Sequence, residues 1–145
     1  MHRKIISLMT TAALLFCLCT SALATDYPVA PIASDYVASV GVSLSANGDG
    51  KMTVKFDVVG KGIMDKVGVM SITIDKKVDG AWKPYTTFSV VQHPEYYAHD
   101  AISKQGSQEF TATPGVTYRA TVLGYAENSS GYDTSYATSG TTVCR

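Results

Sequence analysis

Apolar and polar residues alternate along much of this chain, and a period of two is typical of β-strands with one buried face. Residues 40–45 place Val, Val and Leu at the even positions, and residues 52–58 repeat the pattern with Met, Val, Phe and Val. Between them, the Asn-Gly-Asp-Gly segment at 47–50 contains residues that tolerate positive φ and can close a hairpin. We therefore predict that these two segments pair as antiparallel strands.

Turn signals divide the rest of the pattern into further strands. The glycines at 60–62 are expected to end the second strand, Asp79-Gly80 to turn a hairpin, and Pro114-Gly115 to precede another strand. We predict these further strands at residues 70–75, 81–85, 108–112, 118–124 and 134–143. Residues 89–106 have weak periodicity and are predicted to form a loop that can include one helical turn. About seven strands with regular turn signals favour an all-β, two-sheet antiparallel sandwich.

The first 24 residues have the pattern of a secretory signal peptide. A basic start at residues 2–4 leads into an apolar run at 5–18, and Ala22 and Ala24 place small side chains where signal peptidase cuts. The apolar run of 14 residues is shorter than the roughly 20 needed to cross a hydrocarbon core, so cleavage is favoured over a membrane anchor. We predict a bacterial protein that is secreted to the extracellular space, with its mature chain starting at Thr25.

The 121 residues that remain after cleavage are enough for one domain. We expect a proline-containing leader at 25–36 and the β-sandwich domain at 37–145. Two of the twelve basic residues, Arg3 and Lys4, leave with the signal, so ten remain against twelve acidic residues and the mature formal charge is −2. This balance gives no electrostatic attraction for nucleic acid or for an anionic membrane, and we expect neither as a partner.

Cys144 is the one cysteine left after cleavage, because Cys17 and Cys19 lie in the predicted signal. No internal disulfide can then form, and the core must hold the fold without one. A single thiol near the C-terminus can make an intermolecular disulfide, which would give a covalent dimer. The alternative is a free, partly buried thiol in a monomer.

Residues 112–124 read Ala-Thr-Pro-Gly-Val-Thr-Tyr-Arg-Ala-Thr-Val-Leu-Gly and resemble the fibronectin type III segment in which a Pro-Gly turn precedes a tyrosine corner and an alternating strand. The resemblance implies that Tyr118 packs under the edge of the sandwich and that its hydroxyl bonds a backbone group upstream. Phe56 stands where the second strand's core aromatic belongs, and residues 72–82 resemble the third strand, its hairpin and the tryptophan that follows. The implied fold is a fibronectin type III-like member of the immunoglobulin-like sandwiches.

The likeness extends from about Val40 to Thr142, and each of its motifs is short. Ala112 occupies the place of a usual leucine, Phe56 replaces the commoner tryptophan, and the connection at 89–106 is long. The immunoglobulin pattern itself expects cysteines in strands two and six, which this sequence lacks. The layout is also similar to small uncharacterised single-domain proteins secreted by anaerobic Gram-positive bacteria, and that similarity implies no activity.

One predicted loop contains His93, Glu95, His99 and Asp100, whose side chains are of metal-ligating types. The histidines are six residues apart with a proline between them, which matches no recognised ligand spacing, so a solvated loop is favoured and metal binding stays open. The sequence has no Gly-x-Ser-x-Gly element and no strand-to-helix elbow to expose a nucleophile. We therefore predict no enzyme activity, no catalytic residue and no cofactor.

Aromatic residues give the main functional signal. If the even positions from Tyr118 onward face the core, the pleat turns Leu123 and Tyr125 outward, where solvent normally selects polar residues. The candidate binding face consists of Trp82, Tyr85, Leu123, Tyr125, Tyr132 and Tyr136. The alternative is that these tyrosines only fill strand positions, which their β-propensity favours.

Two kinds of function fit such a face. We predict a non-catalytic interaction module at the cell exterior that binds a protein through an exposed sheet face or edge strand. The alternative is a carbohydrate-binding module whose exposed rings stack on a glycan.

Overall fold

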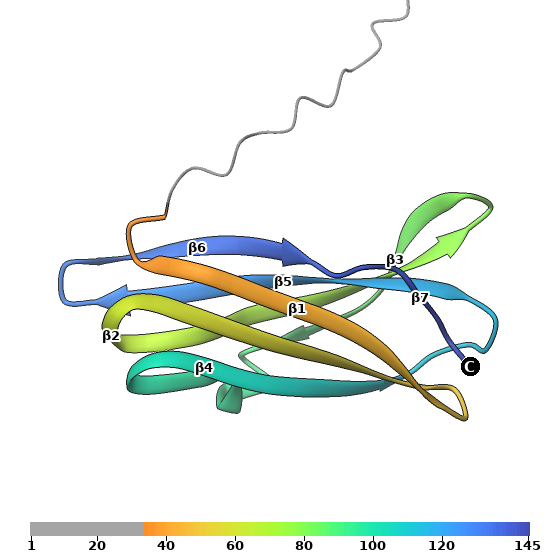
Figure 1. The fold of residues 1–145 in the computed structure, drawn as a ribbon, viewed down its shortest axis with the longest axis horizontal. Helices are drawn as coiled ribbons and strands as arrows, with labels where there is room; N and C mark the ends of the chain where they lie inside the picture. Colours follow the sequence, from red (N-terminus) through yellow and green to blue (C-terminus); the bar gives the residue numbers. More distant parts are fainter. Residues whose placement is uncertain (1–33) are drawn as a thin grey trace, which may run out of the picture. The chain divides into compact units, whose positions relative to one another are not determined.

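The computed structural model describes residues 34–145, so the predicted signal peptide at 1–24 and residues 25–33 of the predicted leader lie outside the described residues. Within that range the chain is all-β, with seven antiparallel strands and one 3-10 turn (Figure 1). This confirms the predicted class and strand number. No helix in residues 34–145 is long and apolar enough to cross a membrane. The elements are β1 (Val37–Gly48), β2 (Lys51–Val78), β3 (Ala81–Ser89), η1 (Pro94–Tyr96), β4 (Tyr97–Thr111), β5 (Thr117–Asn128), β6 (Gly131–Thr138) and β7 (Thr142–Val143).

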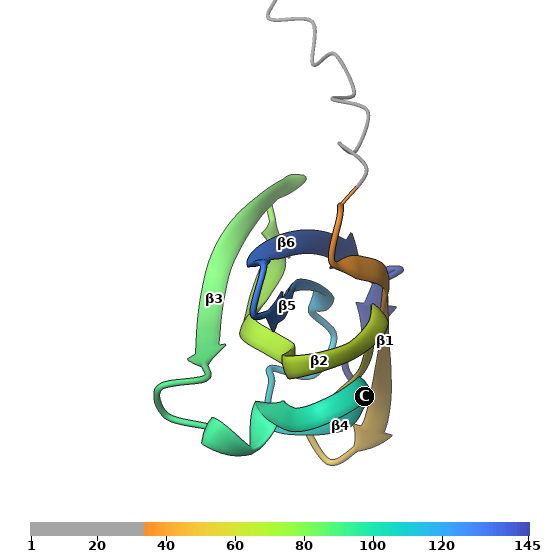
Figure 2. The same cartoon turned by 90° about the vertical axis from the view of Figure 1, so that its left-hand side faces the viewer.

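β2 organises the sheet because it is 28 residues long and pairs with four other strands. Within β2, residues 51–60 pair with β1 and residues 51–68 with β4, whereas residues 66–76 pair with β5 and residues 71–78 with β3. β5 also pairs with β6 and with the short β7. Figure 2, which views the strands end-on, shows β3 on the side opposite β1.

The prediction that the glycines at 60–62 end the second strand is wrong. β2 continues through them, and its register with β4 shifts between Val59 and Met64. Gly60 permits this change because a Cβ atom there would lie 2.6 Å from Met64 Cγ. The glycines therefore mark the place where β2 changes its course without leaving the sheet.

Two predicted hairpins are confirmed. β1 and β2 pair antiparallel with Val42 opposite Phe56, and the turn residues 48–50 all have positive φ. β2 and β3 pair in the same way around Asp79 and Gly80, whose φ angles are 51° and 81°. Asparagine, aspartate and glycine tolerate this backbone region, which is why these turns could be read from the sequence.

The predicted loop at 89–106 is wrong over its second part, because β4 begins at Tyr97. Phe110 is the one buried residue of β4, and β4 pairs with β2 on one side. A strand that is partly exposed on both faces needs no alternating apolar pattern, so periodicity could not reveal it. The predicted final strand at 134–143 also differs, because β6 ends at Thr138 and β7 forms a separate short piece.

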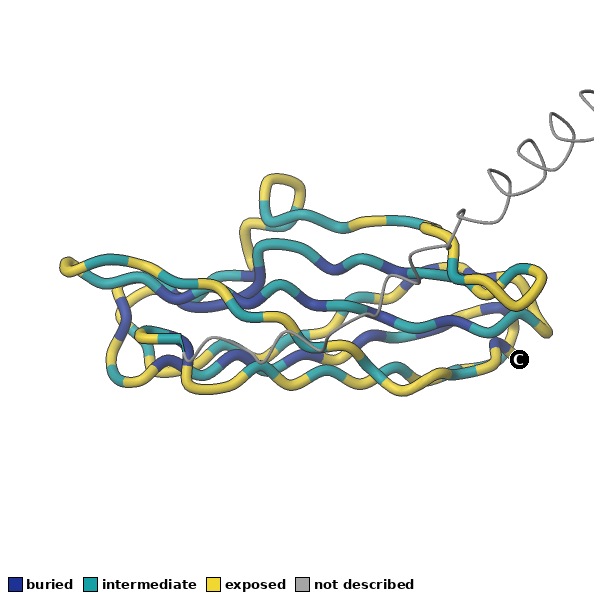
Figure 3. The backbone as a smooth tube through the Cα atoms, turned by 90° about the horizontal axis from the view of Figure 1, so that it is seen from above, coloured by how far each residue is buried: buried dark blue, intermediate teal, exposed yellow. Residues whose placement is uncertain are grey.

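The core is made mainly by inward side chains of β2 and β5, and Figure 3 shows buried positions alternating with more exposed ones along the strands. Tyr118, Ala120 and Val122 are fully buried, as their predicted inner face requires. Phe56, which was expected to be the core aromatic of the second strand, is 4% exposed, and Phe110 is 6% exposed. The buried apolar residues of β2 are Met52, Val54, Phe56, Val58, Met64, Val67, Val69, Ile72 and Ile74.

Candidate functional site

Tyr118 joins the start of β5 to the turn before it. Its side chain is fully buried, and its hydroxyl accepts a hydrogen bond of 2.9 Å from the backbone N–H of Thr113, five residues upstream. Pro114 and Gly115 form the intervening turn, in which Gly115 has a φ of 81°. The hydroxyl is thus the acceptor in this bond, and the backbone group that depends on it is a donor.

The outward side chains of β5 and β6 form one continuous face. In the register of these strands, Leu123 lies opposite Tyr136, Tyr125 opposite Thr134, and Glu127 opposite Tyr132. Tyr132 and Tyr136 are 67% and 72% exposed, although both belong to a regular strand. Large aromatic side chains that remain this exposed within a strand contribute little to the core and are free to contact a ligand or a partner.

Three tyrosines, which we call the tyrosine cluster, meet at one end of this face. The ring of Tyr125 is 5.7 Å from that of Tyr132, centroid to centroid, in a stacked arrangement with an interplanar angle of 29°. It is also 5.7 Å from the ring of Tyr97, at an angle of 41°. Both distances fall in the range of favourable aromatic pairs.

Gly68 explains why Tyr97 reaches the cluster. This residue of β2 lies opposite Tyr97 on one side and Tyr125 on the other, so no side chain separates the two rings. A Cβ atom on Gly68 would lie 2.0 Å from the carbonyl oxygen of Tyr96, so only glycine fits here. Sequence reasoning missed Tyr97 because it placed this residue in a loop. The isolated glycine inside a strand was the available signal of a close backbone approach.

Charged groups brace the tyrosine cluster. The Tyr125 hydroxyl donates to Glu127 Oε2 at 2.9 Å, and Lys66 Nζ lies 3.3 Å from the same oxygen. Burial, followed by the hydrogen bond to Glu127 and the charge of that carboxylate, raises the pKa of Tyr125 to about 12. The Tyr125 hydrogen bond and the Lys66 ammonium together lower the pKa of Glu127. Tyr125 is therefore a neutral donor and Glu127 an anion across the neutral pH range.

Trp82 and Tyr85 do not join the tyrosine cluster. Trp82 lies on β3 under the guanidinium of Arg119, 4.5 Å from the ring centroid, and Arg119 also pairs with Asp75 at 3.0 Å. Arg119 and Tyr125 are six residues apart on β5, which corresponds to about 20 Å along a strand. Tyr85 points elsewhere again, because its hydroxyl donates to the carbonyl oxygen of Thr111 on β4 at 2.9 Å. Of the six predicted residues, four share the β5–β6 face: Leu123, Tyr125, Tyr132 and Tyr136.

The two histidines of the candidate metal loop do not come together. His93 Nδ1 pairs with Glu95 Oε1 at 2.9 Å, and the His93 ring stacks on Tyr96 with centroids 4.9 Å apart. His99 instead lies on β4, with Nδ1 3.2 Å from the carbonyl oxygen of Asp65. Within residues 34–145 no three histidine, cysteine, aspartate or glutamate side chains gather as a metal site would require.

Cys144 is a free thiol with 1% of its surface exposed. Its backbone is held at both ends, because its N–H donates to the carbonyl of Val116 at 3.0 Å and its carbonyl accepts from Gly115 at 2.9 Å. The intermolecular disulfide stays a prediction, and it would require the last residues to detach from this position. A thiol with 1% of its surface exposed is also poorly accessible to an oxidant or to a second thiol.

The fold and this face together define an all-β antiparallel protein with a tyrosine-rich surface on β5 and β6. No known protein family matches the chain, and comparison with curated proteins finds no significant match.

Proposed function

We propose that this chain is a secreted, non-catalytic interaction module that binds a partner protein at the cell exterior. The proposed contact is the tyrosine face, which we define as Tyr97, Leu123, Tyr125, Tyr132 and Tyr136. The observation that supports it is the exposure of Tyr132 and Tyr136, 67% and 72%, beside the packed rings of the tyrosine cluster. Secretion rests on the signal pattern of residues 1–24.

The chemistry of the face favours a protein partner. Tyrosine offers a large rigid ring that loses little conformational freedom on binding, together with a hydroxyl that can find a new hydrogen bond. The tyrosines alternate on β6 with polar neighbours, and Thr134 lies between Tyr132 and Tyr136 on the same face. Aromatic anchors within a polar surrounding are typical of the residues that carry binding energy at protein interfaces.

The packing within the tyrosine cluster prepares this surface for binding. Tyr125 is fixed by its hydrogen bond to Glu127, and its ring supports both Tyr97 and Tyr132. Side chains that are already ordered lose less entropy when a partner arrives, so more of the contact energy appears as affinity.

A fibronectin type III-like, two-sheet sandwich is the proposed finer description of the fold. One layer would contain β1, the first half of β2 and β4, and the other would contain β3, the second half of β2, β5 and β6. The buried apolar side chains of β2 and β5 would lie between these layers. The bond from Thr113 to the Tyr118 hydroxyl supports the same assignment, since a tyrosine corner makes this kind of bond.

A carbohydrate ligand is the second candidate. Tyr132 and Tyr136 lie four residues apart on the same face of β6, so their exposed rings are about 14 Å apart along the strand. Two flat exposed rings at such a spacing can each stack on a different sugar of one glycan chain.

A binding assay with surface variants separates these possibilities. Wild-type protein, Tyr132→Ala, Tyr136→Ala and the control Val91→Ala are immobilised, and each is exposed to detergent-solubilised surface proteins of host cells and to a glycan array. Val91 suits the control because it is 89% exposed and lies outside the tyrosine face. A defined protein retained by wild type and Val91→Ala, and lost or reduced at least about tenfold with the tyrosine variants, supports the proposal. Equal retention by all four proteins refutes the face, and glycan binding that depends on both tyrosines favours the second candidate.

A further inference from the structure

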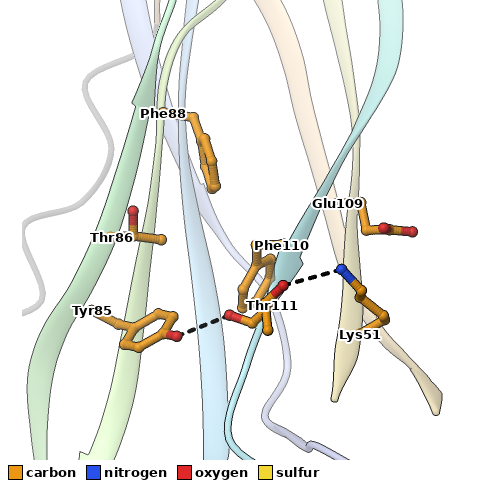
Figure 4. Close-up of a pocket in the computed structure, with 7 residues that line it drawn as sticks. All are labelled: Lys51, Tyr85, Thr86, Phe88, Glu109, Phe110 and Thr111. Carbon is orange, nitrogen blue, oxygen red and sulfur yellow. Dashed lines mark hydrogen bonds between the residues drawn. The ribbon is translucent and has the colours of Figure 1, made fainter. Parts of the chain in front are cut away.

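Two strand edges face a cleft on another side of the protein. β3 and β4 each pair with β2 and have no second strand neighbour within residues 34–145. A cleft of about 550 Å³ lies between them (Figure 4). Its lining residues are Lys51, Tyr85, Thr86, Phe88, Glu109, Phe110 and Thr111. Exposed strand edges carry backbone groups that can pair with an extended chain.

The cleft has an apolar floor. Phe110 is buried, and its ring lies 6.3 Å from that of Tyr85 and 6.0 Å from that of Tyr118. Phe88 is half-buried and lines the same space (Figure 4). The Tyr85 hydroxyl crosses from β3 to the Thr111 carbonyl and limits the cleft at one end. Three of the seven lining residues are aromatic, and a volume of this size can accept one large apolar side chain against them.

One lysine lines the cleft, and two more lie near its Tyr85 end. Lys51 Nζ donates to Thr111 Oγ1 at 3.1 Å, next to the carbonyl that Tyr85 binds. Lys76 Nζ lies 5.3 Å from the Tyr85 ring centroid, and Lys83 is directly opposite Lys76 in the β2–β3 register. None of the ion pairs found within residues 34–145 includes any of these three lysines. Like charges directly opposite on neighbouring strands are destabilising, so the arrangement has a cost that the fold itself does not explain.

We propose that this cleft binds an extended acidic segment of a partner protein, with one aromatic side chain on the apolar floor and flanking carboxylates beside the lysines. The charges around the cleft favour an acidic occupant, because three lysines lie at or near it and Glu109 is the one acidic residue that lines it. The lysines are distributed over three positions on two strands, so several carboxylates along one chain fit them better than a single small anion does. This site is separate from the tyrosine face, and it does not depend on that face binding a partner.

The probe is the peptide acetyl-Asp-Phe-Asp-amide, titrated into the full protein while backbone amide resonances are recorded. Two control peptides replace Phe by Ala or both Asp residues by Lys. We expect the acidic phenylalanine peptide to cause saturable shifts of amide resonances on β3 and β4. The alanine peptide should bind at least about tenfold more weakly, because a buried phenyl ring is lost, and the lysine peptide should show no saturation.

Protein variants test the lysines. Lys51→Ala is expected to weaken the acidic peptide by roughly fivefold, with a smaller effect at high salt. Lys55→Ala is the matched control, because Lys55 is an exposed lysine of the same strand that does not line the cleft. Equal weakening by both variants would show only unspecific attraction and overturn the proposal. No saturation below about 5 mM, or shifts centred on Tyr125 and Tyr132, would also overturn it.

Discussion

Removing the hydroxyl of Tyr118 is the sharpest test of the corner that joins β5 to the preceding turn. Tyr118→Phe keeps the buried ring and its contacts with Tyr85 and Phe110, at centroid distances of 5.3 and 6.0 Å. The change deletes one acceptor and leaves the N–H of Thr113 without its partner. An unsatisfied buried donor costs about 1–3 kcal/mol. Thr113 is exposed and its bond to Tyr118 is only partly buried, so water can reach the N–H in the variant. We therefore expect a loss of stability at the lower end of this range, about 1 kcal/mol.

Urea unfolding followed by tryptophan fluorescence and circular dichroism measures this loss. In thermal unfolding of a domain of about 100 residues, a loss of 1 kcal/mol corresponds to a fall in Tm of about 4–8 °C. Tyr136→Phe is the control, since Tyr136 is 72% exposed and its change should leave stability within about 0.5 kcal/mol. Tyr118→Ala should cost about 3–5 kcal/mol, because it also empties the space of the ring. If Tyr118→Phe equals the control, or is as damaging as the alanine variant, the assigned role of the hydroxyl is wrong.

Three further changes test the site and the core. The pKa of Tyr125 is raised from the ordinary value of 10 to about 12, so the protonated hydroxyl stabilises the folded state below pH 10, and this stabilisation is lost as pH rises through 12. The ultraviolet difference titration between wild type and Tyr125→Phe should contain this late ionisation. Glu127→Gln removes the neighbouring negative charge, and the same titration should show the Tyr125 ionisation at lower pH. An unchanged midpoint would mean that burial alone raises the pKa of Tyr125 and that Glu127 contributes nothing. Gly106→Ala would place a Cβ atom 2.4 Å from the Phe56 ring and should lower the free energy of unfolding in urea by about 1–3 kcal/mol. Gly62→Ala is the control, because a Cβ atom there would have no atom within 4 Å and the change should be close to neutral; equal effects of the two variants would refute the packing argument.

The core strands and their turns could be predicted because their determinants are local. The alternation around Phe56 and Tyr118 follows directly from the pleat, which turns every second side chain inward. The turns at 48–50 and 79–80 were equally readable, since their residues are those that tolerate positive φ. Neither inference needs information about a distant part of the chain.

The edge strand could not be predicted by the same argument. Residues 97–106 gain their order from backbone pairing with β2, and their side chains are partly exposed on both faces. No local pattern records that pairing. Tyr97 was therefore absent from the predicted face, although it contacts Tyr125 across Gly68.

The orientation of Tyr85 also depended on a feature that composition does not reveal. The β2–β3 register shifts between Ile74 and Asp75, so Ile74 faces Thr86 while Asp75 faces Pro84, and Tyr85 is the extra residue. Such a bulge re-aims the side chains around it. Tyr85 consequently points to β4 and lines the cleft instead of the outer face that Leu123 and Tyr125 share.

This division of the aromatic residues gives the protein two separate surfaces along β2. Lys76 of β2 lies beside Tyr85 at the cleft and opposite Tyr118 of β5, whereas Lys66 of the same strand lies beside the tyrosine cluster. Lys66 and Lys76 are ten positions apart, which corresponds to about 33 Å of extended strand, beyond the distance at which side-chain substitutions usually influence each other. A single change at either surface should therefore leave the other intact. Because both surfaces lie along β2, an extended partner could contact both only if its own contact points matched that spacing.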